Sequence, residues 1–358
     1  MISKKCIETE WLNEITKEKK INDKILAEKV IRALFLLEGL AESKLEFIFK
    51  GGTALMLLLN STKRLSIDID IIITKKIELN EIISKIVLQK HFTKFEIQTR
   101  KVRSNIQKAH YKLFYKPTHK TNKPEEYILL DVLFEKSQYQ KTITIPVNSS
   151  FIKQIDNPLF VKVPDFNNIL GEKLTAFAPE TTGIPYEKNG KIMAKEIIKQ
   201  LYDIGTIFNN VDNLSLIKQT FEKFALTELK YRNKGNDINI VLEDIYETSL
   251  NISTKGQEGK ARFDILQKGL KQLVAFIFSE NYHIEKAIIH ASKTAYLSKL
   301  IQLDCNKIEK FENPLQITDR KIEQPFYTKL NKLKKSNPEA FFYWHKIYEL
   351  EKGNILTK

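Results

Sequence analysis

Two aspartates, Asp68 and Asp70, stand two positions apart in the segment 66–73, which has the sequence SIDIDIII. Its β-branched residues and its alternation of polar and apolar side chains predict a strand. Alternate side chains of a strand point to the same face, so the two carboxylates are expected about 7 Å apart. Two like charges on an apolar strand are costly unless a cation lies between them. The pair therefore predicts a divalent metal site, and its oxygen ligands suit Mg²⁺ or Mn²⁺.

A pair of glycines, Gly51 and Gly52, precedes this strand. The apolar residues 47–49 before the glycines predict a short strand, and the apolar stretch 53–60 after them predicts a helix. A glycine turn at the start of a helix lets a phosphate approach the backbone, where the first N–H groups attract anions. Thr53 would add a hydroxyl. Either motif alone is common in turns and solvated strands, but together they predict a site for a nucleotide and a metal ion.

A third carboxylate, Asp131, lies within the apolar segment 127–134, which has the sequence YILLDVLF. A lone charge in an apolar strand is expensive unless it serves a metal or a positive partner. A structural ion pair is the alternative. Glu135, at the end of the same strand, is the second candidate, although a carboxylate there is more typical of a solvated position.

The order of these motifs resembles the nucleotidyltransferase superfamily that includes DNA polymerase beta, and specifically the AbiEii/AbiGii-type (MenT-like) toxins of bacterial toxin–antitoxin and phage-defence systems. These toxins carry a GGTAL turn, which is residues 51–55 here, followed by an RxSxDxD strand. Arg64, Ser66, Asp68 and Asp70 match that strand motif. The superfamily places a third carboxylate on a neighbouring strand, where it binds the metal or takes the proton of the attacking hydroxyl.

The resemblance continues downstream in the segments ILGEKLTAFAPETTGIPY and IIKQLYDIGTIF. It implies that Lys173, in the first segment, neutralises phosphate charge, whereas the sequence alone would favour a surface lysine. Asp203, in the second segment, contacts the nucleotide or orients Lys173. Many relatives have an arginine shortly before this aspartate, and Lys199 is the nearest basic residue here.

The predicted site therefore has three overlapping groups of residues. The expected catalytic residues are Asp68, Asp70, Asp131, Lys173 and Asp203. The expected metal ligands are Asp68, Asp70 and Asp131. The expected nucleotide-binding residues are Gly51, Gly52, Thr53, Arg64, Ser66, Lys173 and Lys199.

Positioning these residues requires an α/β (α+β) architecture. We expect a nucleotidyltransferase fold with a mixed sheet in the N-terminal half, followed by a mostly helical C-terminal domain. The predicted strands cover residues 47–49, 66–73, 95–99, 111–115, 127–134 and 143–146. The predicted helices cover residues 21–40, 53–60, 167–178, 194–209, 214–229, 262–280 and 284–301. The expected divisions are an N-terminal helical segment 1–44, an α/β core 45–165, and a helical domain 166–358 that contributes Lys173 and Asp203.

The composition indicates a polyanionic partner. The chain has 358 residues and a formal net charge of +14. Its segment 94–123 is strongly basic and includes Arg100 and Arg103, with Phe95 and Phe114 among its interleaved aromatic residues. Basic surfaces with rings that stack on bases suit RNA. A half-exposed sheet with no nucleic-acid ligand would show the same pattern.

We therefore predict a metal-dependent toxin that transfers a nucleoside monophosphate from an NTP to RNA, as the resemblance implies for the tRNA 3′ end, and so blocks translation. A cognate antitoxin would restrain it. Two alternatives remain: nucleotidylation of a Ser, Thr or Tyr of a partner protein, and a non-catalytic nucleic-acid-binding protein on the same scaffold. The two cysteines, Cys6 and Cys305, and the short apolar runs favour a cytoplasmic protein without a membrane span.

Overall fold

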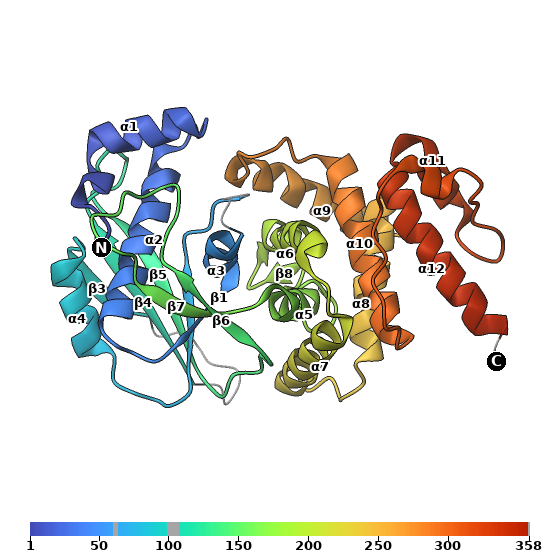
Figure 1. The fold of residues 1–358 in the computed structure, drawn as a ribbon, viewed down its shortest axis with the longest axis horizontal. Helices are drawn as coiled ribbons and strands as arrows, with labels where there is room; N and C mark the ends of the chain where they lie inside the picture. Colours follow the sequence, from blue (N-terminus) through green and yellow to red (C-terminus); the bar gives the residue numbers. More distant parts are fainter. Residues whose placement is uncertain (60–63, 99–106, 357–358) are drawn as a thin grey trace. The chain divides into compact units, whose positions relative to one another are not determined.

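The computed structural model describes residues 1–59, 64–98 and 107–356, without the side chains of residues 354–356. The chain divides into two compact units (Figure 1). Unit 1 comprises residues 1–165 and 276–281, and unit 2 comprises residues 166–275 and 282–358. Residues 276–281, which come late in the chain, therefore belong to the first unit.

Unit 1 is built on a mixed sheet. Its strands are β1 (Ile48–Lys50), β2 (Ile69–Ile73), β3 (Lys94–Ile97), β4 (Gln107–Tyr115), β5 (Glu126–Phe134), β6 (Thr142–Pro146) and β7 (Phe160–Pro164). Its α-helices are α1 (Thr9–Glu18), α2 (Lys24–Glu42), α3 (Gly51–Leu58) and α4 (Asn80–Gln89). The strand order is β3-β4-β5-β2-β1-β7-β6. The pairs β2–β5 and β1–β7 are parallel, and the other neighbouring strands are antiparallel.

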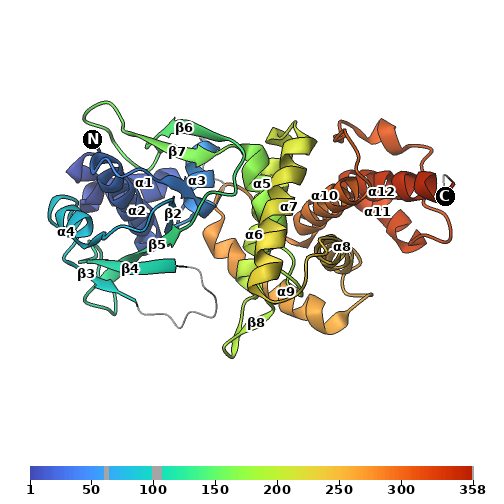
Figure 2. The same cartoon turned by 90° about the horizontal axis from the view of Figure 1, so that it is seen from below.

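The two faces of this sheet differ in chemistry. On β5, Ile128, Leu130 and Val132 are buried in the core of unit 1, whereas Tyr127 and Asp131 alternate with them and are partly exposed. Helices α2 and α4 lie on one side of β3, β4 and β5 (Figure 2). Alternation along a strand puts its apolar and polar residues on opposite faces, so Asp131 lies on the face opposite the core.

Unit 2 is mainly helical. Its α-helices are α5 (Phe166–Ala176), α6 (Ala194–Ile207), α7 (Leu214–Tyr231), α8 (Asn239–Ser253), α9 (Lys260–Leu273), α10 (Ile284–Gln302), α11 (Leu333–Ser336) and α12 (Pro338–Leu356). A small hairpin pairs β8 (Glu187–Lys188) with β9 (Lys191–Ile192). Short 3-10 helices cover Lys4–Ile7, Phe208–Asn210, Val274–Phe276, Pro314–Ile317 and Thr328–Lys332. In the described part of the chain, no helix combines the length and apolar composition that crossing a bilayer requires.

The predicted fold class is confirmed, with a seven-stranded mixed sheet followed by helices. The sequence prediction missed α1, α4, β7, α8 and α12. It also extended one helix too far, because α9 ends at Leu273 and not near residue 280. The apolar residues Phe276 and Phe278 instead pack against the core of unit 1, so their hydrophobicity reflects that core and not a helical face.

Candidate active site

The glycine turn between β1 and α3 is shaped around Asp70. Gly51 has a φ of +79°, a conformation that L side chains rarely adopt. A Cβ atom at this position would lie 2.3 Å from Asp70 Oδ2, which is far inside contact distance. Glycine is therefore required here for two reasons: the backbone is left-handed, and the Asp70 carboxylate occupies the space that a side chain would need. This contact links the turn directly to β2.

Gly52 brings two further predicted residues to the same turn. A Cβ atom there would lie 2.7 Å from Arg64 Nη2 and 2.7 Å from Ser66 Oγ. The buried guanidinium of Arg64 also donates to the carbonyl of Leu65 at 3.2 Å. A guanidinium beside the first N–H groups of a helix is a favourable environment for phosphate.

The hydroxyl of Thr53, which was predicted to contact phosphate, has a backbone partner in this structure. The residue is fully buried, and its Oγ1 donates to the backbone carbonyl of Asp68 at 2.7 Å. A hydroxyl has one proton to donate, and this bond uses it. The side chain of Thr53 therefore ties α3 to the segment that carries Asp68, which lies just before β2 and not within it.

The segment before β2 is held by residues from far along the chain. The N–H of Leu65 donates to the carbonyl of Phe276 at 2.8 Å, and Arg64 forms an antiparallel bridge with Ile277. Phe278 anchors the returning segment by an edge-to-face contact with Phe151, with ring centroids 6.1 Å apart. The position of Arg64 thus depends on a strand-like pairing that local sequence does not specify.

Four polar side chains form a row across neighbouring strands. The register pairs Lys50 of β1 with Asp70 of β2, Asp70 with Asp131 of β5, and Asp131 with His110 of β4. Register partners share a face of a sheet, and adjacent strands are about 4.8 Å apart. The two carboxylates therefore occupy the middle of the row, with a nitrogen-bearing side chain at each end.

His110 makes a direct contact with Asp131. Its Nδ1 lies 2.7 Å from Asp131 Oδ1, and an ionised carboxylate can only accept, so the imidazole Nδ1–H is the donor. The sequence prediction missed His110, because a histidine in a polar-apolar strand has no distinguishing neighbour. Only the pairing of β4 with β5 reveals it. The second candidate carboxylate, Glu135, lies directly after β5 and outside the row.

The carboxylates of Asp68, Asp70 and Asp131 are donors that suit a hard cation, and their predicted role as metal ligands stays a prediction. Among residues 1–59, 64–98 and 107–356, no group of three or more His, Cys, Asp or Glu side chains is arranged to hold a metal ion. Asp131 contacts His110. Mg²⁺ commonly takes one or two protein carboxylates and completes its shell with water and substrate phosphates. Asp68 and Asp70 would supply two carboxylates of this kind.

Unit 2 contains the other predicted residues. Lys173 on α5 and Asp203 on α6 form a buried ion pair, with Lys173 Nζ 3.0 Å from Asp203 Oδ2. Lys173 Nζ also donates to Gln200 Oε1 at 3.0 Å. The surface-lysine alternative is therefore wrong, and the contact between the two residues is observed. Lys199 lies one turn before Asp203 on α6. Contact of any of them with a nucleotide stays a prediction.

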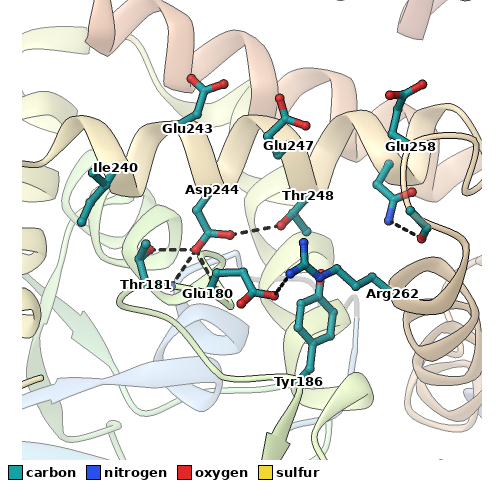
Figure 3. A pocket seen from close by; sticks show the side chains of 12 residues that line it. Glu180, Thr181, Tyr186, Ile240, Glu243, Asp244, Glu247, Thr248, Glu258 and Arg262 are labelled. Atoms are coloured by element: carbon teal, nitrogen blue, oxygen red, sulfur yellow. Dashed lines mark hydrogen bonds and ion pairs between the residues drawn. The ribbon is translucent and has the colours of Figure 1, made fainter. Parts of the chain in front are cut away.

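A cavity of about 410 Å³ within unit 2 has the wrong charge for a nucleotide. Its acidic and basic lining residues are Glu180, Glu243, Asp244, Glu247, Glu258 and Arg262 (Figure 3). The Arg262 guanidinium pairs with Glu180 at 2.9 Å, which leaves the other carboxylates in excess. Burial, together with the charges of Glu243 and Glu258, raises the pKa of Glu247. Such a lining repels a triphosphate, so we do not assign the nucleotide to this cavity.

Comparison with known proteins identifies a matching family. A family model described as "Nucleotidyl transferase AbiEii toxin, Type IV TA system" matches residues 33–280. That range includes every predicted site residue. Among curated proteins, none matches the chain.

Three solved structures are similar to the chain. The nucleotidyltransferase toxin MenT4 from Mycobacterium tuberculosis H37Rv is 13% identical, with a TM-score of 0.45, over 81% of this chain and 98% of that one. A candidate nucleotidyltransferase from H. pylori is 17% identical, with a TM-score of 0.39, over 79% of this chain and 97% of that one. An antigenic nucleotidyltransferase-like protein from Paracoccidioides brasiliensis is 16% identical, with a TM-score of 0.34, over 63% of this chain and 94% of that one. The family assignment depends on the family match alone. The chain belongs to the AbiEii family of nucleotidyltransferase toxins.

Proposed function

We propose that this nucleotidyltransferase transfers a nucleoside monophosphate from an NTP to the 3′ hydroxyl of an RNA, with tRNA as the acceptor that the family resemblance suggests. The observation that carries the proposal is the meeting of the glycine turn with Asp70, in register with Asp131. A phosphate-binding backbone and paired carboxylates are the two parts that such a transfer needs. The acceptor oxygen bonds to the α-phosphorus, pyrophosphate leaves, and the hydroxyl proton is released.

The triphosphate would bind at the start of α3. The N–H groups of Gly51 and Gly52 and the guanidinium of Arg64 surround this position, and Arg64 can form paired hydrogen bonds to phosphate oxygens. The Ser66 hydroxyl lies at the same turn. These donors would hold the phosphates before and during transfer, when negative charge moves to the leaving pyrophosphate.

Asp68 and Asp70 are the residues that would hold a divalent cation. When bound, Mg²⁺ or Mn²⁺ supplies charge neutralisation at the phosphates and lowers the pKa of the attacking hydroxyl. Asp131, one strand away, would take the acceptor's proton. Lys173 is proposed to neutralise phosphate charge, with Asp203 and Gln200 fixing its ammonium. Lys199 would add a positive charge on the same helix.

The acceptor proposal is supported by the open face of the sheet. Lys112 and Phe114 on β4 and Tyr127 on β5 share the face that carries His110 and Asp131, because they are separated from them by even numbers of positions. Phe114 and Tyr127 have ring centroids 5.7 Å apart, and Lys112 Nζ lies 4.5 Å from the Tyr127 centroid. Lysines and rings of this kind bind single-stranded RNA by charge and stacking.

Part of the predicted basic segment lies outside the described residues. Arg100 and Arg103 belong to that part, and the proposal does not use them. Lys94 is described, and its Nζ lies 4.7 Å from the centroid of the Phe114 ring. This lysine extends the basic and aromatic face onto β3.

The proposal is tested by incubating the protein with each α-labelled NTP, total cell RNA and Mg²⁺, and then separating RNA from protein on a gel. Label in RNA supports the proposal, and label in protein alone would replace it with protein nucleotidylation. Addition of EDTA should abolish transfer, and excess Mg²⁺ or Mn²⁺ should restore it; transfer that persists in EDTA would contradict metal dependence.

The same experiment tests the acceptor face. Tyr127→Ala should weaken labelling of RNA while Lys271→Ala, an exposed lysine of α9, leaves it unchanged. Stacking contributes about 1–3 kcal/mol per base, so the apparent KM for RNA should rise roughly 5-fold or more in Tyr127→Ala. Equal labelling by both variants would exclude this face as the acceptor site. In the cell, such an enzyme would act as a cytosolic toxin in phage defence, restrained by a cognate antitoxin.

A further inference from the structure

The proposed chemistry uses the two carboxylates of the row and leaves His110, the direct partner of Asp131, without a role. Its Nδ1 lies 2.7 Å from Asp131 Oδ1, and the exposed fractions of the two side chains are 13% and 32%. The pair lies on the face opposite the apolar core of unit 1. It therefore stands where substrate can reach the sheet, and core packing does not require it.

The backbone fixes this contact. Strands β4 and β5 pair continuously from Gln107 with Phe134 to Tyr115 with Glu126, and His110 and Asp131 are partners within that ladder. The neighbouring residues of β4, Tyr111 and Leu113, are buried and anchor the strand. The register thus brings the imidazole to the carboxylate without a flexible loop.

The contact matters because Asp131 has a second carboxylate beside it. Asp70 occupies the adjacent position in the row, about 4.8 Å away along the sheet. Like charges on adjacent strands repel each other, so a hydrogen bond that orients one carboxylate helps to fix its position. A hydrogen bond from the His110 side draws one oxygen of Asp131 toward β4 and restricts its rotation about χ2.

We propose that His110 is a positioning residue, whose Nδ1–H holds the Asp131 carboxylate in the orientation that nucleotidyl transfer requires. This inference rests on the proposed function of Asp131. Residues that orient a catalytic or metal-binding carboxylate commonly change activity by roughly 10- to 100-fold when removed. His110 acts through Asp131 and makes no contact with the substrate.

The chemistry of asparagine and glutamine provides the sharp test. The side-chain amide nitrogen of Asn is placed near the Nδ1 position of His, and that of Gln near the Nε2 position. His110→Asn should therefore keep most of the transfer rate. His110→Gln and His110→Ala should lower kcat roughly 10- to 100-fold. The KM for NTP should change little, because the phosphate-binding turn is untouched. His119→Ala, at a histidine of unit 1 that contacts Asn13, is the matched control and should behave as wild type.

A second measurement does not depend on activity. In ¹⁵N-labelled protein without nucleotide, the imidazole nitrogens of His110 should show the Nδ1–H form, and Asp131→Asn should abolish the preference because an amide can present either a donor or an acceptor. Equal kcat in wild type and His110→Ala, or an Nε2–H form of His110 in the wild type, would overturn the inference. If the wild-type protein labels no acceptor, the proposed function fails, while the ¹⁵N spectrum still decides whether His110 donates to Asp131.

Discussion

Asp70 and Asp131 occupy the same register position on the adjacent parallel strands β2 and β5. Gly51, at the start of α3, leaves the space that the Asp70 carboxylate fills. The paired acids and the phosphate-binding turn are therefore coupled by a direct contact. A substitution in the turn should therefore disturb the Asp70 carboxylate, and the first prediction uses this coupling.

Gly51→Ala should abolish transfer, whereas Gly190→Ala should not. Both glycines have positive φ values, +79° and +73°, so each substitution carries a similar backbone penalty of about 1–2 kcal/mol. A Cβ at Gly190 meets nothing within 4 Å, whereas at Gly51 it meets the Asp70 carboxylate. Label transfer and thermal unfolding of both variants separate the two effects. Comparable activity in the two variants would show that the contact with Asp70 is unimportant.

Phe278→Ala should loosen the segment that carries Arg64. The substitution removes the contact with Phe151, and a partly buried ring of this size contributes about 2 kcal/mol. The amide of Leu65, which donates to Phe276, should then exchange with deuterium faster than other protected amides of unit 1. Phe160→Ala, at an exposed phenylalanine of β7, is the control. Unchanged exchange at Leu65 would argue against this anchoring role.

Lys173 and Asp203 should depend on each other for stability. Removal of one partner from a buried ion pair leaves an uncompensated charge and typically costs about 3–5 kcal/mol. Lys173→Met and Asp203→Leu should each destabilise unit 2, and the double variant should recover a substantial part of the loss. The cycle is measured by chemical denaturation. If the two single effects simply add, the ion pair makes no net contribution to folding.

Acid should destabilise unit 2 through His290. Burial, with smaller effects of Lys293 and Lys286, lowers the pKa of His290 to about 3. Its ordinary pKa is 6.5, so between these values the unfolded chain binds a proton that the folded chain does not. Stability should therefore be complete above pH 6.5 and fall by up to about 1.4 kcal/mol per pH unit as the pH decreases toward 3. His290→Gln should flatten this part of the curve, measured as the denaturation midpoint against pH. An unaltered slope would assign the acid sensitivity to other groups.

The ring of His290 also explains why residue 205 of α6 is a glycine. A Cβ at Gly205 would lie 2.0 Å from the His290 ring, two residues after Asp203. Gly205→Ala should therefore destabilise unit 2 by several kcal/mol, because both backbone and ring are packed and neither can move freely. The combination with His290→Ala should restore part of the loss. Absence of any restoration would mean that the clash lies elsewhere.

The sequence indicates those candidate residues that stand out in a local pattern. Gly51, Gly52 and the Asp68–Asp70 spacing lie within one short stretch, and Asp131 is a lone charge in an apolar segment. His110 and Lys50 could not be predicted, because their place beside the acids depends on which strands pair and in which register. The burial of Thr53 and the hydrogen bond from its hydroxyl to the Asp68 carbonyl could not be predicted either, because both depend on tertiary structure.

The boundaries of helices and strands were also difficult to predict from local sequence. The apolar residues 276–278 lie beyond the end of α9, and Phe276 and Ile277 pair with Leu65 and Arg64. A hydrophobic pattern reports that residues are buried, but not which core buries them. The short strand β7 was missed although its sequence, FVKVP, alternates in polarity, and its pairing with β1 and β6 establishes it.

The central claim is that Asp70 acts in nucleotidyl transfer and not in folding. Asp70→Asn keeps the size of the side chain but removes its charge, and Asp156→Asn, at a residue with 63% of its side chain exposed, is the matched control. Both proteins are incubated with α-labelled NTP, Mg²⁺ and RNA, and their thermal unfolding is recorded in parallel. We expect Asp70→Asn to lose transfer by on the order of 100-fold or more while it melts like the control. Transfer by Asp70→Asn at the rate of Asp156→Asn would contradict the account.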